Sequence, residues 1–240
     1  MPIEHNPEYI HHTEPGRSSV TRELVFGMED GMVSTLGAVT GIALATQDVF
    51  TTILSGLIVI GVESISMGVG SYLSSKSVRD IAERKLIEER EELKQYPGEE
   101  KEELVEMYVR DGWSAPLARR MVDEAAGDPR LFLQEMAYRE LKIFPTELEN
   151  PLQNGLVMGV SYIVGGAVPI ITYFFLPLTG AAFFSIMVTF IGLFGLGVYT
   201  TKLSKRAWWR AGLEMVVLAG LAALVGYAVG QTVDTLWLRR

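Results

Sequence analysis

The stretch VFGMEDGMVSTLGAVTG, residues Val25–Gly41, carries the main clue to the architecture of this chain. It opens a hydrophobic segment that extends to Thr46, yet Glu29 and Asp30 lie side by side near its start. Hydrocarbon cannot solvate a carboxylate, so an acidic residue inside a membrane span is expected to face other helices or a watery cavity. Glycines and hydroxyl residues recur along the stretch, and small residues let helices approach closely. The stretch therefore predicts a pore-lining membrane helix whose acidic residues bind a cation.

The composition divides the 240-residue chain into unlike parts. Hydrophobic residues make up 48% of it, but charged residues are concentrated in residues 76–150. This distribution predicts a membrane domain interrupted by a soluble insertion. The chain contains no cysteine, which excludes thiolate ligands, disulfides and cysteine nucleophiles, and its histidines (His5, His11, His12) lie in the N-terminal tail. A metal site is therefore expected to use oxygen ligands, with methionine sulfur as the other candidate.

Two further functions are disfavoured by the charge and by the N-terminus. The net charge of −8 argues against nucleic acid as a partner, because nucleic-acid binding depends on neutralising phosphates. The first residues lack the basic region, short apolar run and small-residue cleavage site of a signal peptide. We therefore expect the chain to be directed to a membrane by its own spans.

Hydrophobic runs predict an all-α, polytopic membrane protein with five transmembrane helices. The expected spans are residues 24–46, 53–75, 152–176, 179–200 and 211–233. The corresponding parts of the chain are a polar N-terminal tail, transmembrane helices 1 and 2, an acidic helical domain, and transmembrane helices 3 to 5. Their residues are 1–22, 23–75, 76–150 and 151–240.

The insertion shows no strand pattern and is predicted to be a helical domain. The second span should continue as a helix to about Tyr96, where Pro97 breaks it. Further helices are expected at residues 99–111, after an N-cap at Ser114, and from Asp128 to about Phe144. Placing the basic loop 201–210 inside puts the N-terminus and the insertion in the cytosol.

The membrane spans contain a first group of candidate residues: Glu29, Asp30, Ser34, Glu63 and Met67. Glu63 lies about ten residues into its helix, near mid-membrane, and Met67 follows one turn later on the same face. A carboxylate binds hard cations, and a thioether adds affinity for softer ions such as Fe²⁺. The alternatives are an interfacial position for Glu29, a protonated Glu63 hydrogen-bonded across helices, and ordinary packing for Met67.

A second candidate is the acidic run Glu88–Glu106, with nine acidic residues against three basic ones. Its pairs Glu89/Glu92 and Glu100/Glu103 each place two carboxylates on one helix face at i, i+3. Two such helices in antiparallel contact across Pro97-Gly98 would gather four carboxylates, as carboxylate-bridged metal sites require. A metal site and a merely solvated helix face both fit this run.

The motifs together resemble the vacuolar iron transporter family. FGMEDGMVST at residues 26–35 resembles that family's F-G-x-x-D-G-[LM]-V-S-T signature, and residues 66–70 match S-M-x-x-G. The order of two spans, an acidic insertion and three spans is also similar, and the resemblance covers residues 22–235. It implies a homodimer with the translocation path between its subunits. It further implies movement of Fe²⁺, and often Mn²⁺, Co²⁺ or Zn²⁺, out of the cytosol in exchange for protons.

The resemblance also assigns roles to individual residues. The pathway aspartate and methionine fall on Asp30 and Met67. The ligands of the cytosolic metal site fall on Glu89, Glu92, Glu100, Glu103, Met136 and Glu140. One departure stands out, because many members continue Gly-Glu-[FY] after the methionine motif, whereas here Gly70 is followed by Ser71. This chain instead has Glu63 one turn before Met67.

We therefore expect a transporter rather than an enzyme: an Fe²⁺, and also Mn²⁺, proton antiporter in the lipid bilayer. The membrane would be the cytoplasmic membrane in a prokaryote and the vacuolar membrane in a eukaryote. The alternatives are a membrane-tethered iron-binding or ferroxidase-like protein and a passive divalent-cation channel. The absence of a Glu-x-x-His pair argues against the ferroxidase-like alternative.

Overall fold

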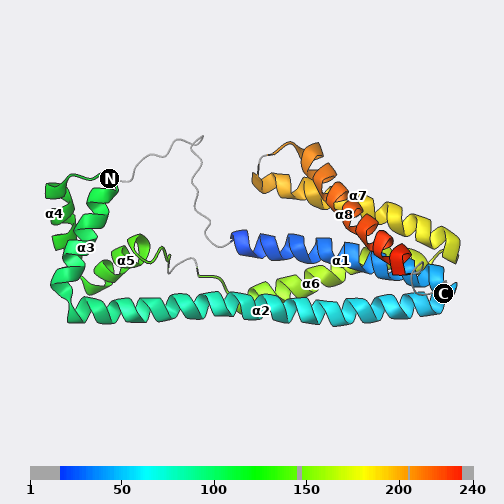
Figure 1. Cartoon of the computed structure of the whole chain (residues 1–240), viewed down its shortest axis with the longest axis horizontal. Helices are drawn as coiled ribbons and strands as arrows, with labels where there is room; N and C mark the ends of the chain where they lie inside the picture. Colours follow the sequence, from blue (N-terminus) through cyan, green and yellow to red (C-terminus); the bar gives the residue numbers. More distant parts are fainter. Residues whose placement is uncertain (1–16, 145–147, 205, 234–240) are drawn as a thin grey trace, which may run out of the picture. The chain divides into compact units, whose positions relative to one another are not determined.

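A computed structural model describes residues 17–144, 148–204 and 206–233, and the regular structure within these ranges is entirely helical (Figure 1). The elements are α1 (Arg17–Thr46), α2 (Val49–Gln95), α3 (Pro97–Arg110), α4 (Ala115–Ala125), α5 (Pro129–Arg139), α6 (Pro151–Ile170), the 3₁₀ turn η2 (Ile171–Phe174), α7 (Leu178–Ser204) and α8 (Trp208–Val233). The predicted all-α class is confirmed. The predicted tail lies mostly outside the described residues, but its residues 17–22 belong to α1.

The helix ends match the sequence patterns with one clear exception. The second span continues without a break as α2 to Gln95, as predicted. Ser114 occupies the N-cap of α4 without a side-chain capping bond, whereas Asp128 caps α5 by accepting a hydrogen bond from the Arg130 N–H at 2.9 Å. The prediction that the last insertion helix reaches Phe144 is wrong. It ends at Arg139, and Lys142 has a φ of 54°, in the left-handed region that ends right-handed helices.

Three of the described helices are long and apolar enough to cross a membrane. They are α2, α6 together with η2, and α7. The acids and glycines of α1 lower its hydropathy, so its assignment as a span stays a prediction, as does that of α8. The described helices thus include three candidate spans, and the total of five stays a prediction.

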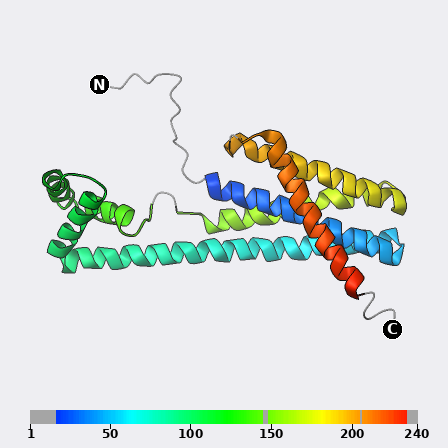
Figure 2. The same ribbon diagram turned by 45° about the horizontal axis from the view of Figure 1, so that its top comes forward.

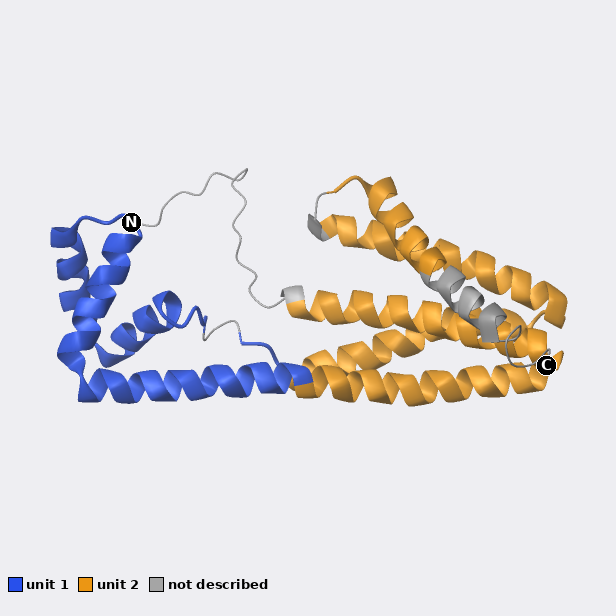
Figure 3. Cartoon of the chain, in the orientation of Figure 1, with its two compact units in different colours: residues 1–18, 74–150 blue, residues 19–73, 151–240 orange. Residues whose placement is uncertain are grey.

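The chain forms two compact units (Figure 3). Residues 74–150, grouped with residues 1–18, form the unit that we call the acidic domain. Residues 19–73 and 151–240 form the unit that we call the membrane domain. Helix α2 contributes to both.

The acidic domain has an apolar core between α3, α4 and α5. Its buried members recur at helical spacing and are Leu104, Val105, Met107, Tyr108, Ala118, Val122, Phe132 and Met136. Burying a side chain such as leucine or phenylalanine contributes about 1.5–3 kcal/mol, so this core holds the three short helices together. Most charged positions of the same helices lie at the surface, and Glu100 of α3 is a buried exception.

In the membrane domain, α1 and α6 pack backbone against backbone. A Cβ atom added to Gly31 would overlap the carbonyl oxygen of Tyr162 and lie 2.9 Å from the amide nitrogen of Gly166. One added to Gly27 would lie 2.7 Å from the carbonyl oxygen of Met158. The close approach predicted for the glycines of this stretch therefore occurs at its first two glycines.

The remaining glycines of α1 have a different environment. Gly37 and Gly41 have no atom within 4 Å of an added Cβ among the described residues. The difference arises because α6 packs closely against the first half of the stretch Val25–Gly41, at Gly27 and Gly31. Small residues were equally frequent in both halves, so spacing alone could not separate them.

We expect Gly31→Ala to destabilise the membrane domain by about 1–3 kcal/mol, since backbone atoms of α6 must move to admit the methyl group. Gly37→Ala, on the same helix, should be neutral or slightly stabilising because alanine favours helices. Thermal unfolding of the two purified variants in one detergent compares them directly. Equal melting temperatures would contradict the proposed α1–α6 contact.

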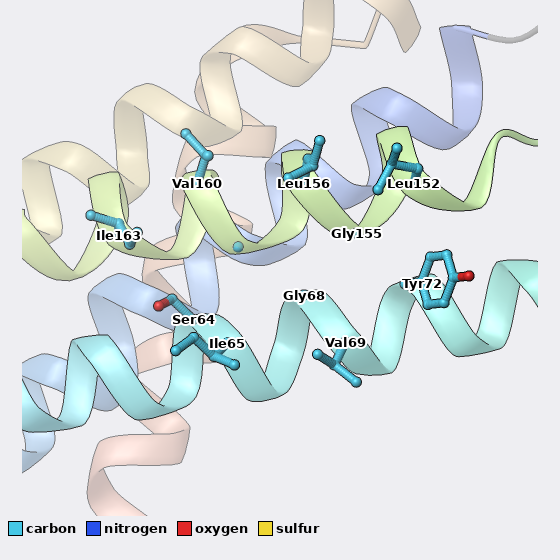
Figure 4. A pocket seen from close by; sticks show the side chains of 11 residues that line it. Ser64, Ile65, Gly68, Val69, Tyr72, Leu152, Gly155, Leu156, Val160 and Ile163 are labelled. Atoms are coloured by element: carbon cyan, nitrogen blue, oxygen red, sulfur yellow. The ribbon is translucent and has the colours of Figure 1, made fainter.

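Helices α2 and α6 also approach closely, and an apolar groove of about 380 Å³ lies along their junction (Figure 4). Gly68 of α2 faces Gly155 of α6, where an added Cβ would lie 2.7 Å from the Gly68 carbonyl oxygen. Apolar side chains such as Ile65 and Leu156 line the groove, with Ser64 and Tyr72 as its polar members. No carboxylate of the described chain lines this groove, so it does not provide a cation site.

Candidate functional site

Three carboxylates meet in the acidic domain. Glu89 of α2, Glu100 of α3 and Glu140 after α5 each offer an oxygen atom, and these atoms lie within 4.8 Å of one another. We call these three residues the carboxylate cluster. They come from α2, from α3 and from the end of α5, so the fold rather than local sequence brings them together.

The turn between α2 and α3 explains which acids join the cluster. Tyr96 alone separates the two helices, and Pro97 fixes the first turn of α3. So short a link does not let α3 fold back along α2; instead α3 turns steeply away from it (Figures 1 and 2). The antiparallel arrangement considered from sequence is therefore replaced by a corner, with Glu89 and Glu100 inside it and Glu140 supplied by α5.

Burial makes the cluster electrostatically unusual. Glu89 is 1% exposed and Glu100 is 8% exposed. Burial, reinforced by the charges of Glu140 and Glu100, raises the pKa of Glu89 to about 8. Burial and the neighbouring Glu103 raise the pKa of Glu100 to about 7. Glu140 is exposed, and partial desolvation of its carboxyl together with the charge of Glu103 raises its pKa. At neutral pH the cluster therefore holds protons unless another cation replaces them.

The cluster also contains unused acceptor atoms. Oε1 of Glu89 and Oε2 of Glu100 are buried and have no hydrogen-bond partner among the described residues. A buried polar atom without a partner is costly and calls for an explanation such as an ion. The unpaired oxygens and the suppressed ionisation both fit a site that a divalent cation completes.

The other expected ligands border the cluster. Glu92 and Glu103 are exposed, but both lie near enough to raise the pKa of Glu140. Met136 is fully buried in the apolar core, one turn before Glu140. The structure thus brings three of the six predicted ligands directly together, and the metal role of all six stays a prediction.

Arg139 forms an anchor beside the cluster that no sequence pattern predicts. The Arg139 guanidinium lies 3.8 Å from the centre of the Tyr108 ring and pairs with Glu135 at 3.3 Å and with Asp111. These contacts fix the last turn of α5 against α3, directly before Glu140. No spacing pattern links Arg139 with Tyr108, because they lie on different helices.

In the membrane domain, Asp30 of α1 and Glu63 of α2 lie close enough to interact electrostatically. Asp30 is half-buried, whereas Glu63 is exposed at the surface of the single chain. Met67 follows Glu63 by one turn and is half-buried, as is Glu29 on α1. The structure therefore places the acids of the first two spans near each other.

The hydroxyl of Ser34 is engaged in helix packing. It donates to the backbone carbonyl of Asp30 at 2.6 Å and lies 2.6 Å from the hydroxyl of Tyr162 on α6. Since Ser34 donates its proton to Asp30, the Tyr162 hydroxyl donates to Ser34. Tyr162 is fully buried and interacts electrostatically with both Asp30 and Glu63. No sequence pattern distinguishes this tyrosine.

Comparison with known proteins identifies the family. The VIT family model matches residues 21–231, which is most of the chain. The chain belongs to the VIT family. The resemblance inferred from the motif at residues 26–35 is therefore confirmed.

Several VIT-family relatives align over nearly the whole chain. Vacuolar iron transporter 1 of Oryza sativa subsp. japonica is 26% identical over 232 residues, covering 95% of this chain and 92% of the relative. Vacuolar iron transporter 1 of Eucalyptus grandis is 24% identical and covers 90% and 87%. The vacuolar iron transporter of Toxoplasma gondii (strain ATCC 50861 / VEG) is 29% identical and covers 89% and 74%. With its apolar helices, the VIT-family chain is an integral membrane protein.

Proposed function

We propose that this protein is a divalent metal/proton antiporter that exports Fe²⁺, and also Mn²⁺, from the cytosol. The observation that carries the proposal is the carboxylate cluster of Glu89, Glu100 and Glu140, in which Glu89 and Glu100 each have a buried oxygen without a hydrogen-bond partner among the described residues. The names of the relatives support iron as the cargo, since they are called vacuolar iron transporters. Metal transport by VIT-family members agrees with both observations.

The ligand chemistry of the cluster favours hard or borderline divalent ions. Three carboxylates suit Mn²⁺ and Fe²⁺, and they also accept Zn²⁺ or Co²⁺ with less selectivity. An ion bound there replaces the protons that the raised pKa values retain, so capture of the metal releases protons. Glu92, Glu103 and the sulfur of Met136 are the further ligands that we propose.

The membrane path that we propose runs along α1 and α2. Asp30, Glu63 and Met67 bind the ion inside the membrane, and Glu29 lies at the mouth of the path. Ser34 orients this part of α1 through its bonds to Asp30 and Tyr162. A carboxylate binds either a proton or the metal, so a proton gradient can drive metal release at the far side.

The assembly that we propose is a homodimer with five spans in each subunit and the path between the subunits. The N-terminus and the acidic domain lie in the cytosol, because the basic loop 201–210 is expected on that side. Helix α2 carries exposed apolar side chains, including Leu57, Ile58 and Val62, which suit lipid or a second copy. The membrane is the cytoplasmic or the vacuolar one, according to the source.

Metal flux into proteoliposomes with an acidic lumen tests this function. Asp30→Asn is expected to lower Mn²⁺ or Fe²⁺ flux by about tenfold or more, because it removes the charge that holds the ion in the membrane. Glu214→Gln is the matched control, since Glu214 is an exposed acid of α8 paired with Arg206 at 3.2 Å. Unchanged flux in Asp30→Asn would remove this residue from the path.

The same vesicles separate the rival functions. Antiport requires flux to depend on the pH gradient and to move protons in the opposite direction. Flux that ignores the gradient would identify a passive channel. Oxygen consumption on addition of Fe²⁺, without metal transport, would identify a ferroxidase-like protein.

A further inference from the structure

A small cavity in the acidic domain gathers positive charge. It measures about 190 Å³ and lies between the end of α2, the start of α3 and the start of α5. Arg90 and Lys94 of α2 and Lys101 of α3 line it. These three are the basic residues of the acidic run Glu88–Glu106, and all of them reach the same cavity. We call this cavity the basic pocket.

The rest of the pocket wall is apolar. Its remaining members are Leu93, Pro97, Ala126, Pro129 and Phe132, and no carboxylate of the described residues lines it. Phe132 is 5% exposed and belongs to the core of the acidic domain, so the folded domain itself forms the floor. Cations placed above apolar side chains suit an anion that carries an apolar body.

The two cations of α2 are not neutralised by the chain. Arg90 and Lys94 are exposed and form no ion pair among the described residues, although acidic residues surround them in the sequence. They stand four residues apart on one helix face, where like charges repel. Arg84, earlier on the same helix, pairs instead with Glu88 at 3.5 Å. The folded chain therefore keeps two neighbouring cations at a cost that a bound anion would relieve.

The third cation, Lys101, has only a weak partner. Its ammonium lies 3.8 Å from the carboxylate of Asp123, beyond the length of a hydrogen bond. The side chain of Asp123 is 74% exposed, so water can replace this contact when an anion binds. The long-range field of the acidic run repels anions, so an anion can be held only by the cations of the pocket itself.

We propose that the basic pocket binds the phosphate monoester group of a small organic anion. The guanidinium of Arg90 presents a planar fork of N–H donors that matches phosphate oxygens, and the two lysines add point charges. The apolar wall beside Phe132 receives the body of the ester. No member of the carboxylate cluster lines the pocket, so the two sites are separate. The inference is independent of the proposed metal transport.

Titration of the purified full-length protein with phenyl phosphate, at constant ionic strength and without metal, tests the site. Binding should saturate, and phenyl phosphate should bind several-fold more tightly than inorganic phosphate because its ring buries apolar surface. Arg90→Gln is expected to weaken binding by about tenfold or more, since a charge-assisted contact is lost. Arg90→Lys should recover part of the affinity, because it restores the charge without the planar fork.

The matched control is Arg84→Gln, which removes the same charge from the same helix outside the pocket. It should change the affinity by less than about threefold. Equal losses in Arg84→Gln and Arg90→Gln would reduce the binding to overall charge and overturn the inference. A wild-type protein that shows no saturation up to about 10 mM phenyl phosphate would also overturn it.

The melting temperature of the ligand-free variants excludes a merely structural role. Arg90→Gln should melt at or above the wild-type temperature, because the change removes the repulsion between Arg90 and Lys94. Weaker binding accompanied by a lower melting temperature would show that Arg90 supports the fold, and would overturn the inference.

The same titration in lipid nanodiscs identifies the source of the phosphate. Phosphatidylcholine discs are compared with discs that also contain phosphatidylinositol 4-phosphate. Equal affinity for phenyl phosphate in both discs would support a soluble ester as the ligand. Weaker apparent affinity in the second disc would support a lipid headgroup that competes for the pocket. Either result supports the phosphate site, and failure of the site would leave the proposed metal transport unaffected.

Discussion

Replacing Glu89 with glutamine is expected to lower the Mn²⁺ affinity of the acidic domain by about 100-fold. Glu89 is the most buried member of the carboxylate cluster, and its Oε1 has no hydrogen-bond partner among the described residues. Glutamine keeps the shape of the side chain but removes the negative charge, so the loss reports ligand chemistry rather than packing. Isothermal titration of the purified full-length protein with Mn²⁺ measures it, in an Asp30→Asn background that silences the membrane path.

The control for this measurement lies one residue earlier on the same helix. Glu88 is exposed and pairs with Arg84 at 3.5 Å, outside the cluster. Glu88→Gln removes the same charge and should change the affinity by less than about threefold, as expected for a solvent-screened group. Equal losses in the two variants would mean that the acidic run attracts metal only through its total charge.

The affinity of the acidic domain for Mn²⁺ is expected to rise on the order of 100-fold between pH 6 and pH 8. The pKa of Glu100 is about 7 and that of Glu89 about 8, so at pH 6 both hold protons that the metal must displace. Below its pKa, each such proton weakens metal binding tenfold for every unit that the pH falls. Titrations at three pH values, in buffers of different ionisation heat, give both the affinity and the number of protons released. Binding that is independent of pH would contradict the cluster as the metal site.

The folding stability of the metal-free protein supplies a control, because it is expected to fall with rising pH while the Mn²⁺ affinity rises. The unfolded chain loses the Glu89 proton near its ordinary pKa of 4.5, whereas the folded domain keeps it to about 8. The folded state thus binds more protons in this interval, and its stability falls as the pH rises through it. Hydrogen exchange of α3 and α5, corrected for intrinsic rates, should show faster opening at pH 8 than at pH 5. Addition of Mn²⁺ at pH 8 should reverse this change.

The sequence was sufficient to predict the all-α class, and the family resemblance named Glu89, Glu100 and Glu140 among six candidate ligands. Helix periodicity could not predict which of these six would lie directly together, because that depends on the short link at Tyr96 between α2 and α3. A two-helix hairpin would have gathered Glu92 and Glu103 as well, and the corner that forms leaves both exposed. Periodicity describes one helix at a time and carries no information about the angle between two.

In the membrane domain, too, contacts between helices could not be predicted from sequence patterns. Glu23 precedes the predicted span 24–46 and received no role from the sequence, and its contact with Ser71 distinguishes it from a surface acid. Ser34 was expected in the path by its place in the motif, yet its hydroxyl bonds to Tyr162, far away in the sequence. Contacts between distant helices decide both cases.

The glycines of α6 have a mechanical consequence for the proposed transport cycle. Gly165 lies against the backbone of Met28 in α1, and Gly155 lies against Gly68 in α2. No side chains separate these backbones, so no side-chain rearrangement is available to let the three helices slide past one another. They are expected to move as one stiff block. Access to Asp30 would then alternate by displacement of this whole block against its surroundings, and bending of α1 by itself would contribute little.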